Sequence, residues 1–112
     1  MNHTGIMGHH PYQYKAVAAW GMLDKKQYPV KDCHEMVMDK KGRLIMVTDE
    51  IKNNIIIYDR SGKLITTWGN EFPGGHGLTL FDEGGEEVLF ICDPNTGRVV
   101  KTTLDGKTIM EL

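Results

Sequence analysis

The chain has 112 residues, of which 40% are hydrophobic and 25% are charged, and its formal net charge is -2. These values are typical of a folded globular protein and argue against a disordered or collagen-like chain. Lys and Arg are scattered among Asp and Glu without forming a basic stripe, so we expect no nucleic-acid partner. No run approaches the roughly 18 apolar residues that cross a bilayer, and residues 1–20 lack the apolar centre of a secretory signal. We therefore expect no membrane partner and a cytoplasmic location.

The N-terminal part of the chain divides into two pieces. Residues 1–13 form an N-terminal segment with no strand pattern. Residues 14–22 begin with YKAVAAWG, which is similar to the segment KLITTWG that ends at Gly69. We predict that residues 14–22 form a closing outer strand, which completes a sheet whose other strands lie elsewhere.

An internal repeat with a period of roughly 44 residues organises the rest of the chain, and periods of this size are typical of solenoids and propellers. The two copies span residues 32–69 and 76–112. Their second halves align without a gap, and two extra residues fall in the turn around Gly84 and Gly85, where a hairpin loop can absorb them. The matched pairs are His34 with His76, Asp49 with Asp93, and Gly62-Lys63 with Gly106-Lys107.

Each copy contains four short apolar runs separated by turns rich in Asp and Gly, the pattern of a four-stranded antiparallel meander. The predicted strands are residues 34–38, 44–48, 54–58 and 64–68 in the first copy, and 76–81, 87–91, 98–104 and 108–112 in the second. We therefore predict an all-β fold of two β-propeller blades plus the N-terminal closing strand. Closed propellers have about four to eight blades, so this is an incomplete propeller.

The fold alone explains most of the conspicuous side chains. Acidic residues at strand ends are expected to accept turn hydrogen bonds, Trp residues to pack between blades, Met residues to fill the core and the cysteines to be buried free thiols. These residues are Asp39, Asp49, Asp59, Asp93, Trp20, Trp68, Met36, Met38, Met46, Cys33 and Cys92.

The order of strands and turns resembles the NHL repeat. The pieces that carry the resemblance are VMD ending at Asp39, MVTD ending at Asp49, IIIYD ending at Asp59, the SGK turn that follows, and Trp68-Gly69. This resemblance covers about residues 14–112 and implies a six-bladed propeller. It also implies calcium as a candidate cofactor.

Within that class, the sequences CHEMVMD and GGHGLTLFD are most similar to propellers related to the peptidyl-α-hydroxyglycine α-amidating lyase. The resemblance implies that His34 and His76 project into the central channel and ligate zinc. A catalytic zinc site needs about three protein ligands. The third could come from His9, His10 or Glu35, from blades outside this chain, or from another copy. Glu35 is also the candidate for a catalytic base.

Two functions follow from this reading. The first is a metal-dependent lyase-like or hydrolase-like enzyme whose channel histidines act on a small molecule or peptide, with the isolated chain inactive. The second is a scaffold in which propeller loops bind a protein or peptide and the histidines are structural. Both leave two blade flanks uncovered, so we expect as partners either missing blades of a longer chain or further copies of this chain, as in a homotrimer.

Overall fold

The computed structural model describes residues 5–112 and shows an all-β chain. Its strands are β1 (Ile6–His9), β2 (Tyr12–Lys15), β3 (Cys33–Met38), β4 (Leu44–Thr48), β5 (Ile55–Tyr58), β6 (Leu64–Trp68), β7 (Gly77–Glu83), β8 (Glu86–Asp93), β9 (Arg98–Thr103) and β10 (Thr108–Glu111). Among these residues, no helix is long and apolar enough to cross a membrane.

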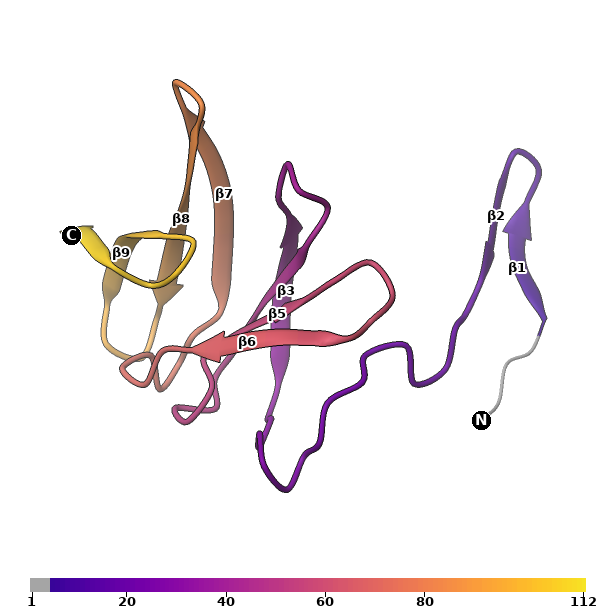
Figure 1. Cartoon of the computed structure of the whole chain (residues 1–112), viewed down its shortest axis with the longest axis horizontal. Coiled ribbons are helices and arrows are strands. Elements are labelled where there is room, and N and C mark those ends of the chain that lie inside the picture. Colours follow the sequence, from indigo (N-terminus) through magenta and orange to yellow (C-terminus); the bar gives the residue numbers. More distant parts are fainter. Residues whose placement is uncertain (1–4) are drawn as a thin grey trace.

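Eight of the strands form two antiparallel sheets of four strands each, in the orders β3-β4-β5-β6 and β7-β8-β9-β10 (Figure 1). Within each sheet, every strand pairs with the next one along the chain, so each sheet is a meander. The predicted strands agree with the observed ones to within two residues at either end. The prediction of two propeller-type blades is therefore confirmed at the level of strand order and pairing.

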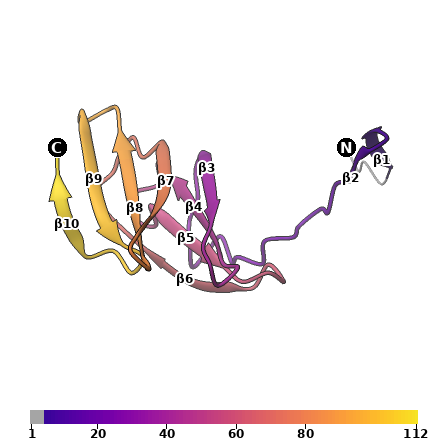
Figure 2. The ribbon, with the colours of Figure 1, turned by 90° about the horizontal axis from the view of Figure 1, so that it is seen from above.

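The two sheets pack face to face, with β7 beside β3 and β4 (Figure 2). Because side chains alternate along a strand, one face of each sheet supplies the apolar core between them. The first sheet contributes Ile45, Val47, Ile55 and Ile57, the second contributes Leu78, Leu89, Ile91 and Val100, and Phe72 enters from the linker between them. Burying each of these side chains stabilises the fold by about 1.5–3 kcal/mol.

The outer face of the first sheet is apolar, and its β3 edge is exposed, whereas Ile56 and Tyr58 on the same face are buried. Met36 and Met38 are 58% and 54% exposed, whereas Val37 between them packs against the core. The expectation that these two methionines fill the core is therefore wrong, because strand alternation directs them away from the second sheet. Met46 lies on the same face and is half-buried.

The N-terminal region differs from its prediction. Tyr14 and Lys15 belong to β2, which pairs with β1 in a hairpin that stands apart from the sheets (Figure 1). Of residues 16–22, only Met22 makes a β-bridge, to Lys63. The expected strand over 14–22 is absent because backbone groups of a strand need a neighbour to bond with. Here β1 supplies that neighbour, and the blade that residues 14–22 would close is not in the described chain.

Trp20 nevertheless takes the position that its similarity to Trp68 predicts. A methyl group added at Gly62 would lie 3.3 Å from Cδ2 of Trp20, and one added at Gly106 would lie 2.8 Å from Cδ2 of Trp68. Each indole therefore covers the equivalent turn of the blade that follows it. Trp68 also donates its Nε1–H to the Leu104 carbonyl at 3.0 Å, which confirms that it packs between blades.

In the first blade, the turn from β3 to β4 and the turn from β5 to β6 have the same hydrogen-bond pattern. In each, the Asp carboxylate accepts the N–H groups two and four residues further on, at 3.0 and 2.8 Å for Asp39 and at 2.8 and 3.1 Å for Asp59. Asp39 is buried and also pairs with Arg43 Nε at 2.7 Å. Burial opposes the charge of Asp39, but the hydrogen bonds from Arg43 and Lys41 hold its pKa below the usual range.

We expect Asp39→Asn to lower the free energy of unfolding by about 1–3 kcal/mol, because the buried donors lose a charged acceptor. The lowered pKa means that this contribution is fully present above about pH 4 and is lost as the pH falls through the folded-state value. Urea unfolding between neutral and acidic pH measures both effects. Asp59→Asn, in the more exposed turn, is the matched control and should cost less. Equal losses would contradict this account.

Candidate functional site

The two sequence-equivalent histidines lie together at one end of the blade junction. His34 is the second residue of β3, and His76 immediately precedes β7, where its N–H donates to the Cys92 carbonyl at 3.0 Å. Their imidazole rings are stacked, with centroids 4.2 Å apart and planes inclined by 21°. The repeat therefore brings both predicted site residues to one place.

Asp49 adds a carboxylate to this pair. Its Oδ2 lies 4.0 Å from Nε2 of His34, and its Oδ1 accepts the Asp32 N–H at 3.1 Å. The sequence analysis assigned Asp49 only to a turn. The pairing of β3 with β4 sets Cys33 opposite Thr48 and therefore Asp49 opposite Asp32, two residues from His34. The approach of the Asp49 carboxylate to His34 depends on side-chain placement that the sequence does not indicate.

Glu35 connects the two blades. Its Oε2 accepts the Leu78 N–H at 2.7 Å, so the carboxylate of a β3 residue bonds to the backbone of β7. A charge-assisted hydrogen bond of this kind holds the two first strands in a fixed register. The observed contact gives Glu35 a structural position next to the histidines, and its role as a base stays a prediction.

His9 and His10 lie elsewhere. His9 ends β1 and His10 begins the turn to β2, in the hairpin that stands clear of the two sheets (Figure 2). The structure therefore does not bring either of them to His34 and His76.

The histidine pair matches zinc in donor chemistry but not in ligand number. Neutral imidazole is a common zinc ligand, and a carboxylate is another. Among residues 5–112, however, no group of three or more His, Cys, Asp or Glu side chains is placed to hold a metal ion. The lone pairs of the stacked rings also lie in nearly parallel planes, whereas a tetrahedral ion needs them to converge on one point. A zinc site here requires a ring rotation and a ligand from outside the described residues.

The thiol of Cys33 is adjacent to this site in sequence. Both cysteines are free, as expected, but Cys33 is exposed rather than buried, and Cys92 is half-buried. Although the residue as a whole is exposed, partial burial of its sulfur, followed by the negative charges of Asp32 and Asp49, raises the pKa of the Cys33 thiol. A thiol with a raised pKa stays protonated at neutral pH, so Cys33 is poorly suited to act as a nucleophile or a thiolate ligand.

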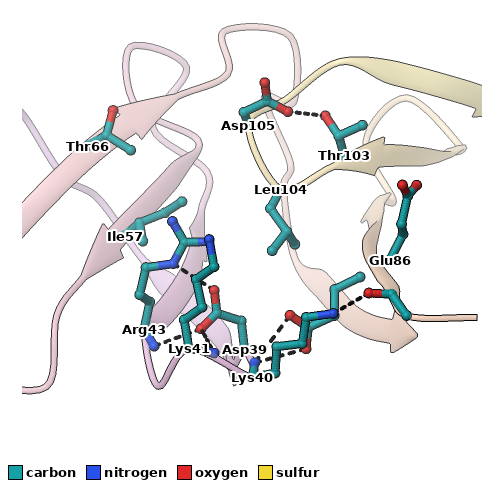
Figure 3. Close-up of a pocket in the computed structure, with 12 residues that line it drawn as sticks. Asp39, Lys40, Lys41, Arg43, Ile57, Thr66, Glu86, Thr103, Leu104 and Asp105 are labelled. Atoms are coloured by element: carbon teal, nitrogen blue, oxygen red, sulfur yellow. Dashed lines mark hydrogen bonds and ion pairs between the residues drawn. The ribbon is translucent and has the colours of Figure 1, made fainter. Parts of the chain in front are cut away.

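A hollow of about 430 Å³ lies between the sheets at the opposite end of β3 and β7 from the histidines (Figure 3). Ile57 and Leu104 form its apolar part, and the paired Asp39 and Arg43 lie beside them. The N–H of Lys40 donates to both oxygens of the Glu87 carboxylate, at 2.9 and 3.2 Å, which ties the rims of the two blades together.

A second hollow, of about 350 Å³, lies on the outer side of the second sheet next to His76. Its lining includes Gly77, Cys92 and Val99, together with the turn from Asp93 to Arg98. The Asp93 carboxylate is not free there, because it accepts N–H groups from Asn95 at 2.8 Å, Thr96 at 3.2 Å and Gly74 at 3.2 Å. The expected structural role of Asp93 is thus confirmed.

Comparisons with known proteins do not show which family the chain belongs to. No family model matches it, and no solved structure does. It is similar to the acid ceramidases of Pan troglodytes and Homo sapiens, with 25% identity over 89 residues. That similarity covers 78% of this chain but 22% of each ceramidase, so the chain spans about a fifth of the length of these relatives. A match of this extent does not show membership of a family.

Proposed function

We propose that this chain is a two-blade section of an NHL-type propeller whose histidines, His34 and His76, line the central channel and bind a divalent metal ion in a lyase-like enzyme. The observation that carries the proposal is the stacking of the two imidazoles at equivalent positions of consecutive blades. Two histidines that share a place in the repeat and also meet in space point to a shared ligand.

The residues of the site divide the work of such an enzyme. His34 and His76 would supply two neutral nitrogen ligands, and Asp49 would accept a hydrogen bond from the His34 ring after a small shift from the observed 4.0 Å. Glu35 would keep the two blades, and therefore the two rings, at a constant separation. The bound ion would polarise an oxygen atom of a small substrate. Zinc suits this ligand type better than calcium, which prefers oxygen ligands.

We expect zinc binding by the intact chain, measured by competition with a chromophoric chelator, to be lost in both His34→Ala and His76→Ala. His10→Ala, in the separate hairpin, is the matched control and should bind as the wild type does. Binding should also weaken in acid, because protonated imidazole cannot ligate a metal. Unchanged zinc binding in both channel variants would refute the proposal.

A non-catalytic scaffold is the second candidate, and the hollow in Figure 3 favours it. That hollow joins the rims of both blades and combines an apolar floor with charged groups of both signs, which suits an extended peptide. A scaffold of this kind predicts no metal and tolerance of both histidine substitutions. The zinc titration therefore separates the two candidates.

A further inference from the structure

The linker between the two blades makes a defined junction with the first sheet. Phe72 is buried in the core that the first sheet shares with the second, in the same cluster as Val47 and Ile55. Asn54 holds the Phe72 backbone on both sides, since its Oδ1 accepts the Phe72 N–H at 3.0 Å and its Nδ2 donates to the Phe72 carbonyl at 2.8 Å. The aromatic side chain of this linker residue thus packs in a site on the preceding blade, which we call the seat.

The second sheet has the same seat without an occupant in the described chain. In the first sheet, Val47 pairs with both Glu35 and Ile55, and in the second sheet Cys92 pairs with both Gly77 and Val99. By strand pairing, Cys92 and Val99 therefore correspond to Val47 and Ile55, which share the core cluster with Phe72. This pairing shifts β8 by one residue from the sequence alignment that matches Asp49 with Asp93. Cys92 and Val99 both line the 350 Å³ hollow next to His76.

The first blade has a linker of the same kind before it. Tyr28-Pro29 follows Trp20-Gly21 and precedes His34, just as Phe72-Pro73 follows Trp68-Gly69 and precedes His76. A side chain of the following blade donates a hydrogen bond to a backbone carbonyl of each linker, although the two carbonyls are not at equivalent positions. Asn53 Nδ2 donates to the Pro29 carbonyl at 3.0 Å, and Arg98 Nη1 donates to the Glu71 carbonyl at 3.4 Å. The described chain therefore carries an aromatic linker residue with no preceding blade.

The outer faces of the two sheets are also equivalent to the two faces that pack together within the chain. The outer face of the first sheet, with Met36 and Met38, corresponds by strand pairing to the face of the second sheet that is buried in the core, with Leu78 and Leu80. The outer face of the second sheet carries exposed Phe81. Exposed apolar surfaces of this kind mark sites of association.

We propose that two copies of this chain associate head to tail, with the first blade of one copy packing on the outer face of the second blade of the other. The seat at Cys92 and Val99 would then receive Tyr28 of the second copy, as the first sheet receives Phe72. The evidence is that the chain contains both halves of a junction that it already forms once internally. Repetition of such a heterologous contact closes a ring by rotation.

The proposed contact completes the histidine site. It sets His34 of the second copy beside His76 of the first, by the same geometry that stacks the two rings within one chain. Each interface would therefore extend the line of imidazoles, which supplies the ligand that the described residues lack. The contact itself needs no metal, so it can be tested separately from the proposed metal binding.

Sedimentation of the intact chain in the presence of a chelator tests the proposal. Three copies of 12.7 kDa would give a species of about 38 kDa, a ring of six blades. Tyr28→Ala and Val99→Arg damage opposite halves of the contact, so each should sediment near 12.7 kDa. Tyr14→Ala, in the separate hairpin, is the control and should assemble as the wild type does. A wild-type monomer at the highest soluble concentration would overturn the proposal.

A mixture of the two variants shows which surfaces meet. The Tyr28→Ala copy keeps its seat and the Val99→Arg copy keeps its tyrosine, so one intact junction remains and a pair of about 25 kDa should form. No pairing in the mixture, with both variants folded by circular dichroism, would contradict a head-to-tail contact. Because Tyr28 lies in the linker before the first blade and Val99 lies in the second blade, failure of one variant to fold leaves the other to test its half of the contact.

Discussion

Replacement of Phe72 by alanine should lower the free energy of unfolding by about 3–5 kcal/mol, the range for deleting a buried aromatic side chain. Phe72 is 1% exposed and packs in the core between the two sheets. Its loss would leave a cavity that the sheets cannot close without giving up their own contacts, because the Asn54 side chain still fixes the linker backbone. Urea or guanidinium unfolding, followed by circular dichroism, measures the change.

Phe81→Ala is the matched control for this substitution. Phe81 lies in β7 of the second blade but is 53% exposed, so its truncation removes little buried surface. In the dissociated chain we expect it to cost less than about 1 kcal/mol, as surface substitutions generally do. Similar losses for the two variants would mean that Phe72 does not fill a seat between the blades.

Asn54→Ala should cost about 3 kcal/mol or more, the second largest effect. The Asn54 side chain is fully buried and donates to the Thr48 and Phe72 carbonyls, at 3.0 and 2.8 Å, while accepting the Phe72 N–H. Each buried polar group left without a partner costs about 1–3 kcal/mol. Removal of one side chain here leaves several such groups in both the strand end and the linker.

Asn70→Ala provides the comparison for Asn54. Asn70 is exposed and lies in the same linker, two residues before Phe72. Its substitution should leave stability nearly unchanged, and hydrogen exchange at the Phe72 amide should accelerate only in the Asn54 variant. A protected Phe72 amide in Asn54→Ala would contradict the role assigned to this side chain.

The strands and their order could be predicted from the sequence because their cause is local. Residues 44–48 and 64–68 alternate or cluster apolar side chains between turns that contain Asp and Gly, and the structure has strands at those bounds. The meeting of His34 and His76 also followed from sequence, since equivalent positions of adjacent repeats lie side by side when the blades stack.

Other features depended on contacts that the sequence does not record. Tyr14 and Lys15 pair with β1 in a hairpin because the expected partner strands are not in the described chain. Met36 and Met38 are exposed for the same reason, since no further sheet covers them. The Asn54 clamp on Phe72 joins residues of a turn and a linker, and neither residue type alone indicates that pairing.

The stacking of the two blades through their first strands is the claim on which the site, the proposed function and the head-to-tail contact all depend. The most direct test is the proton nuclear Overhauser spectrum of the chain with its His34 and His76 rings assigned. Ring centroids 4.2 Å apart predict strong cross-peaks between the two imidazoles. Assigned rings without any cross-peak, together with none between the apolar faces of the two sheets, would show that the blades do not pack in this way.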